Sequence, residues 1–281
     1  MKLYRIQDQI ILEHDLKVYQ LVHSDWDTLI NQNDLSQYLA SQISVLPSFN
    51  DSQWLSSQTL SAPIVSQEIW AAGVTYLRSK VARMEESKVS GGADFYAKVY
   101  EAERPEIFFK STAARAVGHG GNVFIRKDSQ WNVPEPELTL FANASGKIVG
   151  YTIGNDMSSR DIEGENPLYL PQAKSYDHSA AIGPCLWIPE KPIDPNTAIR
   201  MQIIRDGADV FSGQISINQM KRTHEELIGY LFREMSFPNG AYLMTGTCLV
   251  PPNEFTLAIG DVVNISIDGI GTLSNAVAHR H

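Results

Sequence analysis

Hydrophobic residues past Trp70 occur in short runs, each bounded by Gly, Pro, Asn or Asp. Short apolar runs between turn-forming residues are typical of β-strands. A helical pattern interrupts them at 79–86, and the capping box Thr223-His224-Glu225-Glu226 predicts a second helix that continues through Tyr230 and Phe232. The pattern therefore predicts a β-rich mixed α/β domain with short helices. Its expected strands include 107–109, 123–125, 138–141, 148–153, 201–204 and 262–267.

The first forty residues have a different pattern. Apolar positions predict short strands at 3–5 and 17–21 and then one helix that starts at Asp25. The apolar face of this helix consists of Leu29, Ile30, Leu35, Tyr38 and Leu39. A stretch rich in Ser and Gln follows at 41–67, which indicates a connecting segment. We therefore expect a small N-terminal α+β domain with its linker at 1–66 and the main domain at 67–281.

A predicted hairpin brings three acidic residues together. Polar and apolar residues alternate from Glu137 to 141, the sequence 143–146 offers turn chemistry, and a second apolar run follows at 148–153. Residues two apart in a strand share a face, which places Glu135 beside Glu137. If the turn centres on 145–146, the numbers of cross-strand partners sum to about 291. Asp156 then lies opposite Glu135.

Three ionised carboxylates at this spacing repel one another strongly. Each pair at about 4 Å costs on the order of 4 kcal/mol at an effective dielectric constant of about 20. Three such pairs approach the whole stability of a domain, roughly 5–15 kcal/mol. An all-oxygen set suits a hard divalent cation, so we expect Mg²⁺, with Mn²⁺ or Ca²⁺ as alternatives. The spacing alone leaves open that the acids share protons or splay apart on a solvated strand face.

Composition and charge exclude some classes of function. The chain has 281 residues, of which 43% are hydrophobic and 20% charged, as in ordinary soluble proteins. A net charge of −9 argues against nucleic-acid binding, which needs a basic surface. The only two cysteines, Cys185 and Cys248, have flanks that indicate buried thiols. The first residues lack an apolar signal core and no stretch is long enough for a membrane span, so we expect a cytoplasmic protein.

Several short motifs between Trp70 and Val277 are specific through their order and spacing. With them the chain resembles the fumarylacetoacetate hydrolase superfamily and, within it, the 2-keto-3-deoxy-pentonate (2-dehydro-3-deoxy-D-arabinonate) dehydratase-like branch. The motifs are Arg104-Pro105-Glu106-Ile107-Phe108-Phe109-Lys110, Pro134-Glu135-Pro136-Glu137-Leu138, Gly154-Asn155-Asp156-Met157-Ser158-Ser159-Arg160-Asp161, Pro171-Gln172-Ala173-Lys174-Ser175-Tyr176-Asp177, Met244-Thr245-Gly246-Thr247 and Ile270-Gly271-Thr272-Leu273-Ser274-Asn275.

The resemblance implies a fold, a metal and a class of substrate. The fold is a roll of twisted β-sheets around a cavity centred on Mg²⁺, usually in a homodimer or higher homo-oligomer. The family's metal ligands match Glu135, Glu137 and Asp156. Its substrates are small 2-oxo acids or diketones, whose oxygens can chelate the metal. Polarisation of the keto group then acidifies the neighbouring carbon and stabilises an enolate.

Lys174 matches the family's active-site lysine. A lysine beside a divalent cation can have its pKa lowered toward neutrality, which suits it to abstract or deliver a proton. The spacing alone leaves open a surface lysine that pairs with Asp177 or Glu190.

Glu106 matches a glutamate that is characteristic of the dehydratase branch. A carboxyl group against apolar neighbours tends to stay protonated and can serve as the acid toward a leaving hydroxyl. The alternative is a salt bridge to Arg104 or Lys110.

Substrate binding is implied for two arginines and two hydroxyl residues. A guanidinium group can hold a carboxylate in a bidentate pair, although either arginine could instead pair with Glu86 or Asp161. Thr247 fits a family position where a hydroxyl and a backbone amide meet the substrate, and a plain turn threonine is the alternative. The candidates are Arg78, Ser79, Arg160 and Thr247.

Two departures from the family pattern affect the function. No histidine occurs from 71 to 118, where the hydrolase branch carries the base that activates water. His119 and His178 lie near cavity motifs but are expected to be structural, and Cys248 stands where the family more often has Gly or Pro. The leading hypothesis is therefore a Mg²⁺-dependent dehydratase that converts 2-dehydro-3-deoxy-D-pentonate to 2,5-dioxopentanoate. The alternatives are a C–C hydrolase, an oxaloacetate decarboxylase or tautomerase, and a non-catalytic metal-binding protein.

Overall fold

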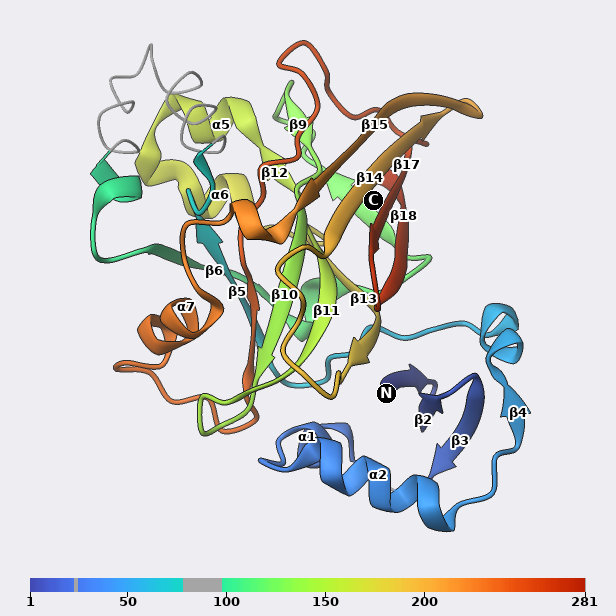
Figure 1. The fold of residues 1–281 in the computed structure, drawn as a ribbon. Helices are drawn as coiled ribbons and strands as arrows, with labels where there is room; N and C mark the ends of the chain where they lie inside the picture. Colours follow the sequence, from blue (N-terminus) through green and yellow to red (C-terminus); the bar gives the residue numbers. More distant parts are fainter. Residues whose placement is uncertain (23–24, 78–97, 281) are drawn as a thin grey trace.

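A computed structural model describes residues 1–22, 25–77 and 98–280. Arg78, Ser79 and the helix predicted at 79–86 lie outside the described residues. Within the described part, the largest sheet has eleven strands in the order β4-β3-β2-β1-β13-β11-β10-β16-β5-β6, with β7 paired to β13 (Figure 1). Its strands are β1 (Lys2–Ile6), β2 (Gln9–His14), β3 (Lys17–Leu21), β4 (Asn50–Asp51), β5 (Glu68–Gly73), β6 (Glu106–Thr112), β7 (Ala116–Val117), β10 (Pro136–Ala142), β11 (Ile148–Asp156), β13 (Ala180–Trp187) and β16 (Ala241–Met244).

A second, five-stranded sheet covers one face of the large sheet. Leu138 and Leu140 of β10 share a buried cluster with Met201, Ile203 and Ile265 of this second sheet. Phe141, the residue after Leu140, belongs to a cluster on the opposite face. Strand β10 is therefore buried along its whole length. The five strands run in the order β15 (Ala208–Ser216), β14 (Ala198–Arg205), β17 (Val262–Ile267), β18 (Gly271–His279) and β8 (Asn122–Ile125), and a separate pair joins β12 (Ser158–Ser159) to β9 (Asn132–Val133).

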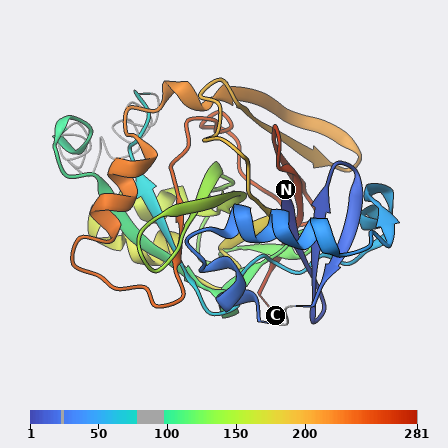
Figure 2. The same ribbon diagram turned by 60° about the horizontal axis from the view of Figure 1, so that its bottom comes forward.

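The N-terminal region contains two helices where the sequence predicts one. Helix α1 (Trp26–Ile30) ends at Asn31, and α2 (Leu35–Val45) begins after Asp34. Asn31 accepts a hydrogen bond from the amide of Ala144, and Asn33 accepts one from the Ser145 hydroxyl. The residues between the two helices are thus hydrogen-bonded to the turn of the β10–β11 hairpin. In Figure 2 the two helices, in blue, lie in front of the strands.

The N-terminal strands belong to the same sheet as the main domain. Leu3 of β1 pairs with Leu186 of β13. Strand β2, which lies between β1 and β3 in the sheet, was not predicted from the sequence. The expected connection at 41–67 carries the end of α2, strand β4 and a 3₁₀-helix, η1 (Ser52–Ser57). The division into domains at 1–66 and 67–281 stays a prediction.

The predicted hairpin is confirmed together with its register. Glu137 pairs with Gly154 and Leu138 with Ile153, which gives the expected sum of residue numbers. The amide of Asp156 donates to the carbonyl of Glu135 at 2.9 Å. Gly146 allows the turn because its φ of 76° is in the left-handed region.

The remaining helices are short and connect the strands. The predicted cap of α7 (His224–Leu231) is confirmed, since Thr223 accepts a hydrogen bond from the amide of Glu226. Among the described residues, no helix has both the length and the apolar character needed to cross a membrane. Further helical segments include η2 (Ala113–Arg115), α5 (Arg160–Glu165), η3 (Pro167–Tyr169), α6 (Leu170–Lys174) and η4 (Ile217–Gln219).

Candidate active site

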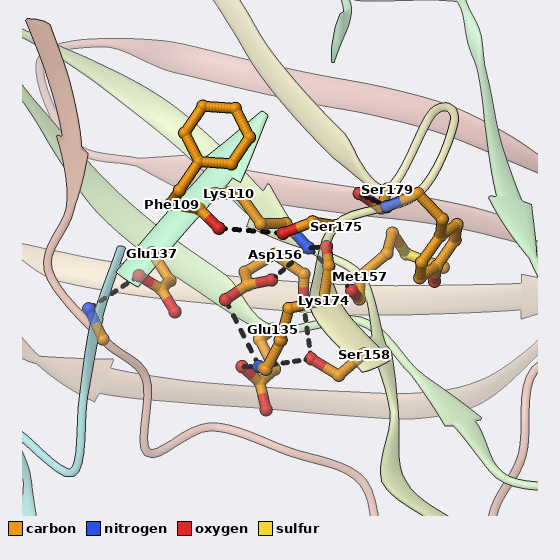
Figure 3. A network of polar contacts seen from close by, with 12 residues as sticks. Phe109, Lys110, Glu135, Glu137, Asp156, Met157, Ser158, Lys174, Ser175 and Ser179 are labelled. Carbon is orange, nitrogen blue, oxygen red and sulfur yellow. Dashed lines mark hydrogen bonds and ion pairs between the residues drawn. The ribbon is translucent and has the colours of Figure 1, made fainter. Parts of the chain in front are cut away.

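The three acids of the hairpin meet at the end of strands β10 and β11. Glu135 directly precedes β10, Glu137 is its second residue, and Asp156 is the last residue of β11. All three are buried, and one carboxylate oxygen from each lies within 4.8 Å of the others. Figure 3 shows them side by side. The sequence-based alternative of acids that splay apart on a solvated face is therefore wrong.

Lys174 points its side chain into this cluster from the end of α6. Its Nζ lies 2.6 Å from Glu135 Oε2 and 3.3 Å from Asp156 Oδ2 (Figure 3). It also donates a hydrogen bond to the hydroxyl of Ser158 at 2.6 Å. The side chain is 1% exposed, so the alternative of a surface lysine paired with Asp177 is wrong.

Two further basic side chains contact the acids. Nζ of Lys110 lies 2.5 Å from Asp156 Oδ1, and Nη2 of Arg160 donates to Glu135 Oε1 at 2.6 Å. Together with Lys174, three basic groups therefore face the three acids. The charge argument from the sequence was incomplete, because protein cations also compensate the clustered negative charge. The case for a metal depends instead on the geometry and chemistry of the oxygens.

The surroundings shift the pKa values of the acids in opposite directions. Burial raises the pKa of Glu137 well above its usual range, and the charges of Asp156 and Glu135 raise it further. Burial also acts to raise the pKa of Asp156, but Lys110 and Lys174 outweigh it and hold this pKa below its usual value. Asp156 therefore loses its proton more readily than Glu137 does.

A cavity of about 430 Å³, including its part open to solvent, adjoins the cluster. Thr247 lines it, and the Thr247 hydroxyl accepts a hydrogen bond from the amide of Leu249. The amide of the preceding Gly246 donates to Glu137 Oε2 at 2.6 Å and so holds that carboxylate. The cavity is lined by Ala72, Gly73, Val74, Phe108, Glu135, Glu137, Asp156, Arg160, Lys174, Gly246, Thr247, Cys248 and Val250.

Glu106 is not one of the residues that line the cavity, but it lies against Gly73, which is. It pairs with Gly73 across strands β6 and β5, and a Cβ added to Gly73 would overlap the Glu106 carboxylate. Gly73 itself lines the cavity. The absence of a side chain at Gly73 therefore lets the Glu106 carboxylate lie beside the cavity. Lys110, the sequence-based alternative partner, pairs with Asp156 instead.

His119 and His178 have the structural positions expected from the sequence, and both cysteines are buried as expected. His119 accepts from the amide of Ser274, His178 stacks on Phe124, and neither lines the cavity. Both cysteines are buried, and burial raises the pKa of Cys185 to about 12. Cys248 is also part of the cavity wall.

Sequence reasoning missed Lys110, Ser158 and the amide of Gly246 as parts of the cluster. All three occur in the motifs that carry the family resemblance, which was the available signal. A contact by a backbone amide or by a lysine in an apolar strand has no separate pattern in the sequence. The roles of the candidate residues in catalysis and substrate binding stay predictions.

The donor set fits a magnesium ion. Mg²⁺ takes oxygen ligands at about 2.0–2.1 Å, so two of its ligands are at most about 4.2 Å apart. The three carboxylate oxygens lie within 4.8 Å of one another, which is close to this value. All three donors are hard oxygens, as Mg²⁺ prefers.

The family assignment follows from comparison with known proteins. Residues 68–278 match the family model described as fumarylacetoacetate (FAA) hydrolase C-terminal. The chain belongs to this family. The FAA hydrolase fold expected from the sequence, with its twisted β-sheets and short helices, is thereby confirmed.

Three relatives define its place in the FAA hydrolase family. A "Probable 2-keto-3-deoxyxylonate dehydratase" of Haloferax volcanii is 51% identical over 216 residues, which cover 76% of this chain and 73% of that protein. The 2-dehydro-3-deoxy-D-arabinonate dehydratase of Saccharolobus solfataricus is 43% identical over 223 residues, covering 79% and 75%. A solved 2-keto-3-deoxy-D-arabinonate dehydratase, complexed with magnesium and 2,5-dioxopentanoate, has a TM-score of 0.84 at 35% identity and covers 100% of both chains.

Proposed function

We propose that the protein is a Mg²⁺-dependent dehydratase that converts a 2-keto-3-deoxy sugar acid, 2-dehydro-3-deoxy-D-pentonate, to 2,5-dioxopentanoate. The observation that carries the proposal is the meeting of three buried carboxylates and Lys174 at one small cavity. The support from relatives is that a dehydratase with the same fold is known in complex with magnesium and this product. The enzyme is then a lyase of the hydro-lyase type.

In this proposal Glu135, Glu137 and Asp156 hold the metal. When bound, Mg²⁺ supplies a Lewis acid that polarises the 2-keto group of the substrate. Arg160 and Thr247 lie on the same cavity wall as the acids; in this proposal Arg160 binds the substrate carboxylate, and Thr247 contacts the substrate through its hydroxyl and its backbone amide. Arg160 is well suited to this task, because its guanidinium group can donate to a carboxylate through two nitrogens.

Lys174 and Glu106 carry the proton transfers of the proposed reaction. Lys174 takes a proton from C3, and Glu106 gives a proton to the C4 hydroxyl, which leaves as water. The resulting C3–C4 double bond is conjugated with the keto group. A proton then leaves C5, the carbon that bears the remaining hydroxyl, and a proton returns to C3, which leaves an enol across C4 and C5. The enol gains a proton at C4 and loses its hydroxyl proton, which yields the aldehyde at C5. The balance is the loss of one water molecule.

The positions of these residues support their roles. Ser158, Glu135 and Asp156 hold Lys174 Nζ at the cavity, and this nitrogen lies 5.8 Å from the centre of the Phe108 ring. Glu106 lies on the same strand as Phe108, two residues earlier, and two residues apart in a strand share a face. Lys174 and Glu106 therefore approach the substrate from different elements, α6 and β6.

Incubation of the purified enzyme with 2-dehydro-3-deoxy-D-pentonate and Mg²⁺ tests the proposal. Mass spectrometry should show loss of water and accumulation of 2,5-dioxopentanoate. An acylpyruvate and oxaloacetate should be tested under the same conditions. Faster release of pyruvate from the acylpyruvate, or faster decarboxylation of oxaloacetate, would replace the dehydratase with one of the two alternative activities. Absence of turnover on all three substrates by a metal-loaded protein would favour a binding protein.

A cytoplasmic location and a homo-oligomeric state stay predictions from the sequence. Fractionation of the source cells and light scattering of the purified protein measure them directly.

A further inference from the structure

Lys110 occupies an irregular position in strand β6. Phe109 pairs with Trp70 of β5, and Ser111 pairs with Ile69, so Lys110 is an extra residue between two consecutive pairs. Such a β-bulge locally redirects the side chain of the extra residue and is frequent next to active sites. The bulge therefore accounts for a lysine that points into the interior from a strand of the large sheet.

The interior position of Lys110 is fully satisfied by polar contacts. Its side chain has 0% exposure, and Nζ lies 2.5 Å from Asp156 Oδ1. The same nitrogen donates hydrogen bonds to the carbonyl of Met157, at 2.9 Å, and to the carbonyl of Lys174 (Figure 3). One buried ammonium group thus joins strand β6, the end of β11 and the end of α6.

The contacts of Lys110 hold two parts of the site in place, the carboxylate of Asp156 and the backbone of Lys174. The ion pair takes one oxygen of Asp156 and thereby fixes the direction of the other, Oδ2, which faces Lys174. The hydrogen bond to the Lys174 carbonyl fixes the backbone from which the Lys174 side chain extends. A lysine in the interior is costly to bury, so its retention beside a cation site needs a compensating role.

We propose that Lys110 is a positioning residue, which orients Asp156 and the Lys174 backbone and makes the acid cluster selective for Mg²⁺ over larger cations. The inference rests on the metal site of the proposed function but not on the identity of the substrate. Mg²⁺ requires nearly ideal octahedral geometry, whereas Ca²⁺ accepts longer and more variable ligand distances. Loss of orientation at Asp156 therefore weakens Mg²⁺ binding more than Ca²⁺ binding.

The test is a calorimetric titration of the full-length, chelator-treated protein with Mg²⁺ alone and with Ca²⁺ alone. Residues that orient a metal ligand typically change metal affinity by about 10–100-fold when they are removed. We expect Lys110→Met to weaken Mg²⁺ binding within this range and to weaken Ca²⁺ binding less, so that the ratio of the two affinities falls. The variant Lys110→Gln keeps a donor for the carbonyls but lacks the ion pair, and it decides the question if Lys110→Met does not fold.

Ser175→Ala is the matched control. The Ser175 hydroxyl donates to the carbonyl of Phe109, so it also joins the end of α6 to β6, but it does not touch the acids. Its removal should leave the ratio of Mg²⁺ to Ca²⁺ affinity unchanged.

Two results would overturn the role of Lys110 alone. Equal weakening for both cations would show that Lys110 only supports the fold. Unchanged or tighter Mg²⁺ binding would show that Lys110 acts only as a competing positive charge. If the wild-type protein bound no Mg²⁺, the proposed metal site would be wrong, and the role of Lys110 with it.

Discussion

The ammonium group of Lys174 lies 2.6 Å from Glu135 Oε2, and both side chains are almost completely buried. A buried ion pair of this kind has two consequences when one partner is removed. The remaining charge loses its compensation, and any chemistry that depends on the missing group stops. The two effects can be measured separately.

Replacement of Lys174 by Met should affect both turnover and stability. Loss of a general acid or base typically lowers kcat by about 10²–10⁴-fold. Glu135 would also lose a buried partner, which typically costs about 3–5 kcal/mol of unfolding free energy. We expect this loss in urea unfolding of the metal-free protein, and a smaller loss with saturating Mg²⁺. Lys147→Met is the control, because Lys147 is exposed and its replacement should change stability by less than about 0.5 kcal/mol. Wild-type kcat in Lys174→Met would remove Lys174 from the mechanism.

Removal of the metal should abolish activity, and addition of Mg²⁺ should restore it. A cation at 100 times its dissociation constant stabilises the folded protein by about 2.7 kcal/mol. This stabilisation should disappear in Glu137→Gln, whose amide oxygen can still accept the hydrogen bond from Gly246. The variant should therefore fold normally, and thermal unfolding with and without Mg²⁺ measures the difference. Equal stabilisation of both proteins would exclude Glu137 as a ligand.

Gly73→Ala should displace Glu106 without disturbing the acid cluster. A Cβ at this position overlaps the Glu106 carboxylate, and misplacement of a catalytic group by about 1 Å can cost about 10²-fold in rate. We expect kcat to fall by this order while Mg²⁺ affinity stays at the wild-type value. Gly229→Ala is the control, because a Cβ there meets no neighbour within 4 Å and should stabilise helix α7 by about 0.5–1 kcal/mol. Unchanged kcat in Gly73→Ala would argue against Glu106 as the acid.

His224 should make the stability of the protein depend on pH. Burial lowers the pKa of His224 from its ordinary value of 6.5, and its place in the first turn of α7 also disfavours a positive charge. As the pH falls through 6.5, the unfolded chain takes up a proton before the folded one does. The free energy of unfolding should therefore fall until the pH is below the folded-state pKa. Urea unfolding at pH 7.5 and 5.5 should show a smaller difference in His224→Gln, and identical differences would contradict the assignment.

The hairpin could be predicted in detail because all of its determinants are local. The turn residues at 143–146 fix which residues of the two strands face each other, and the two-residue period fixes which side chains share a face. Glu135, Glu137 and Asp156 therefore followed from counting along the chain. The family resemblance then supplied Lys174, which the structure brings to the same cluster.

Other features depend on contacts between distant segments, which the pattern does not contain. The apolar face of 29–39 fits one helix, and its division at Asn31 depends on hydrogen bonds to the hairpin turn more than a hundred residues later. Lys110 follows an apolar run as an ordinary strand-end lysine would. Its interior position depends on the bulge against β5 and on the charge of Asp156.

The pairing of β1 with β13 gives the N-terminal segment a protective role. Leu3 and its neighbour Lys2 pair along one edge of β13, whose opposite edge pairs with the hairpin strand β11. A chain that began at residue 67 would expose the backbone of β13 along this edge. Open strand edges recruit strands from other molecules. Pairing with β1 therefore closes part of an edge of β13 that would otherwise be open to a strand from another molecule.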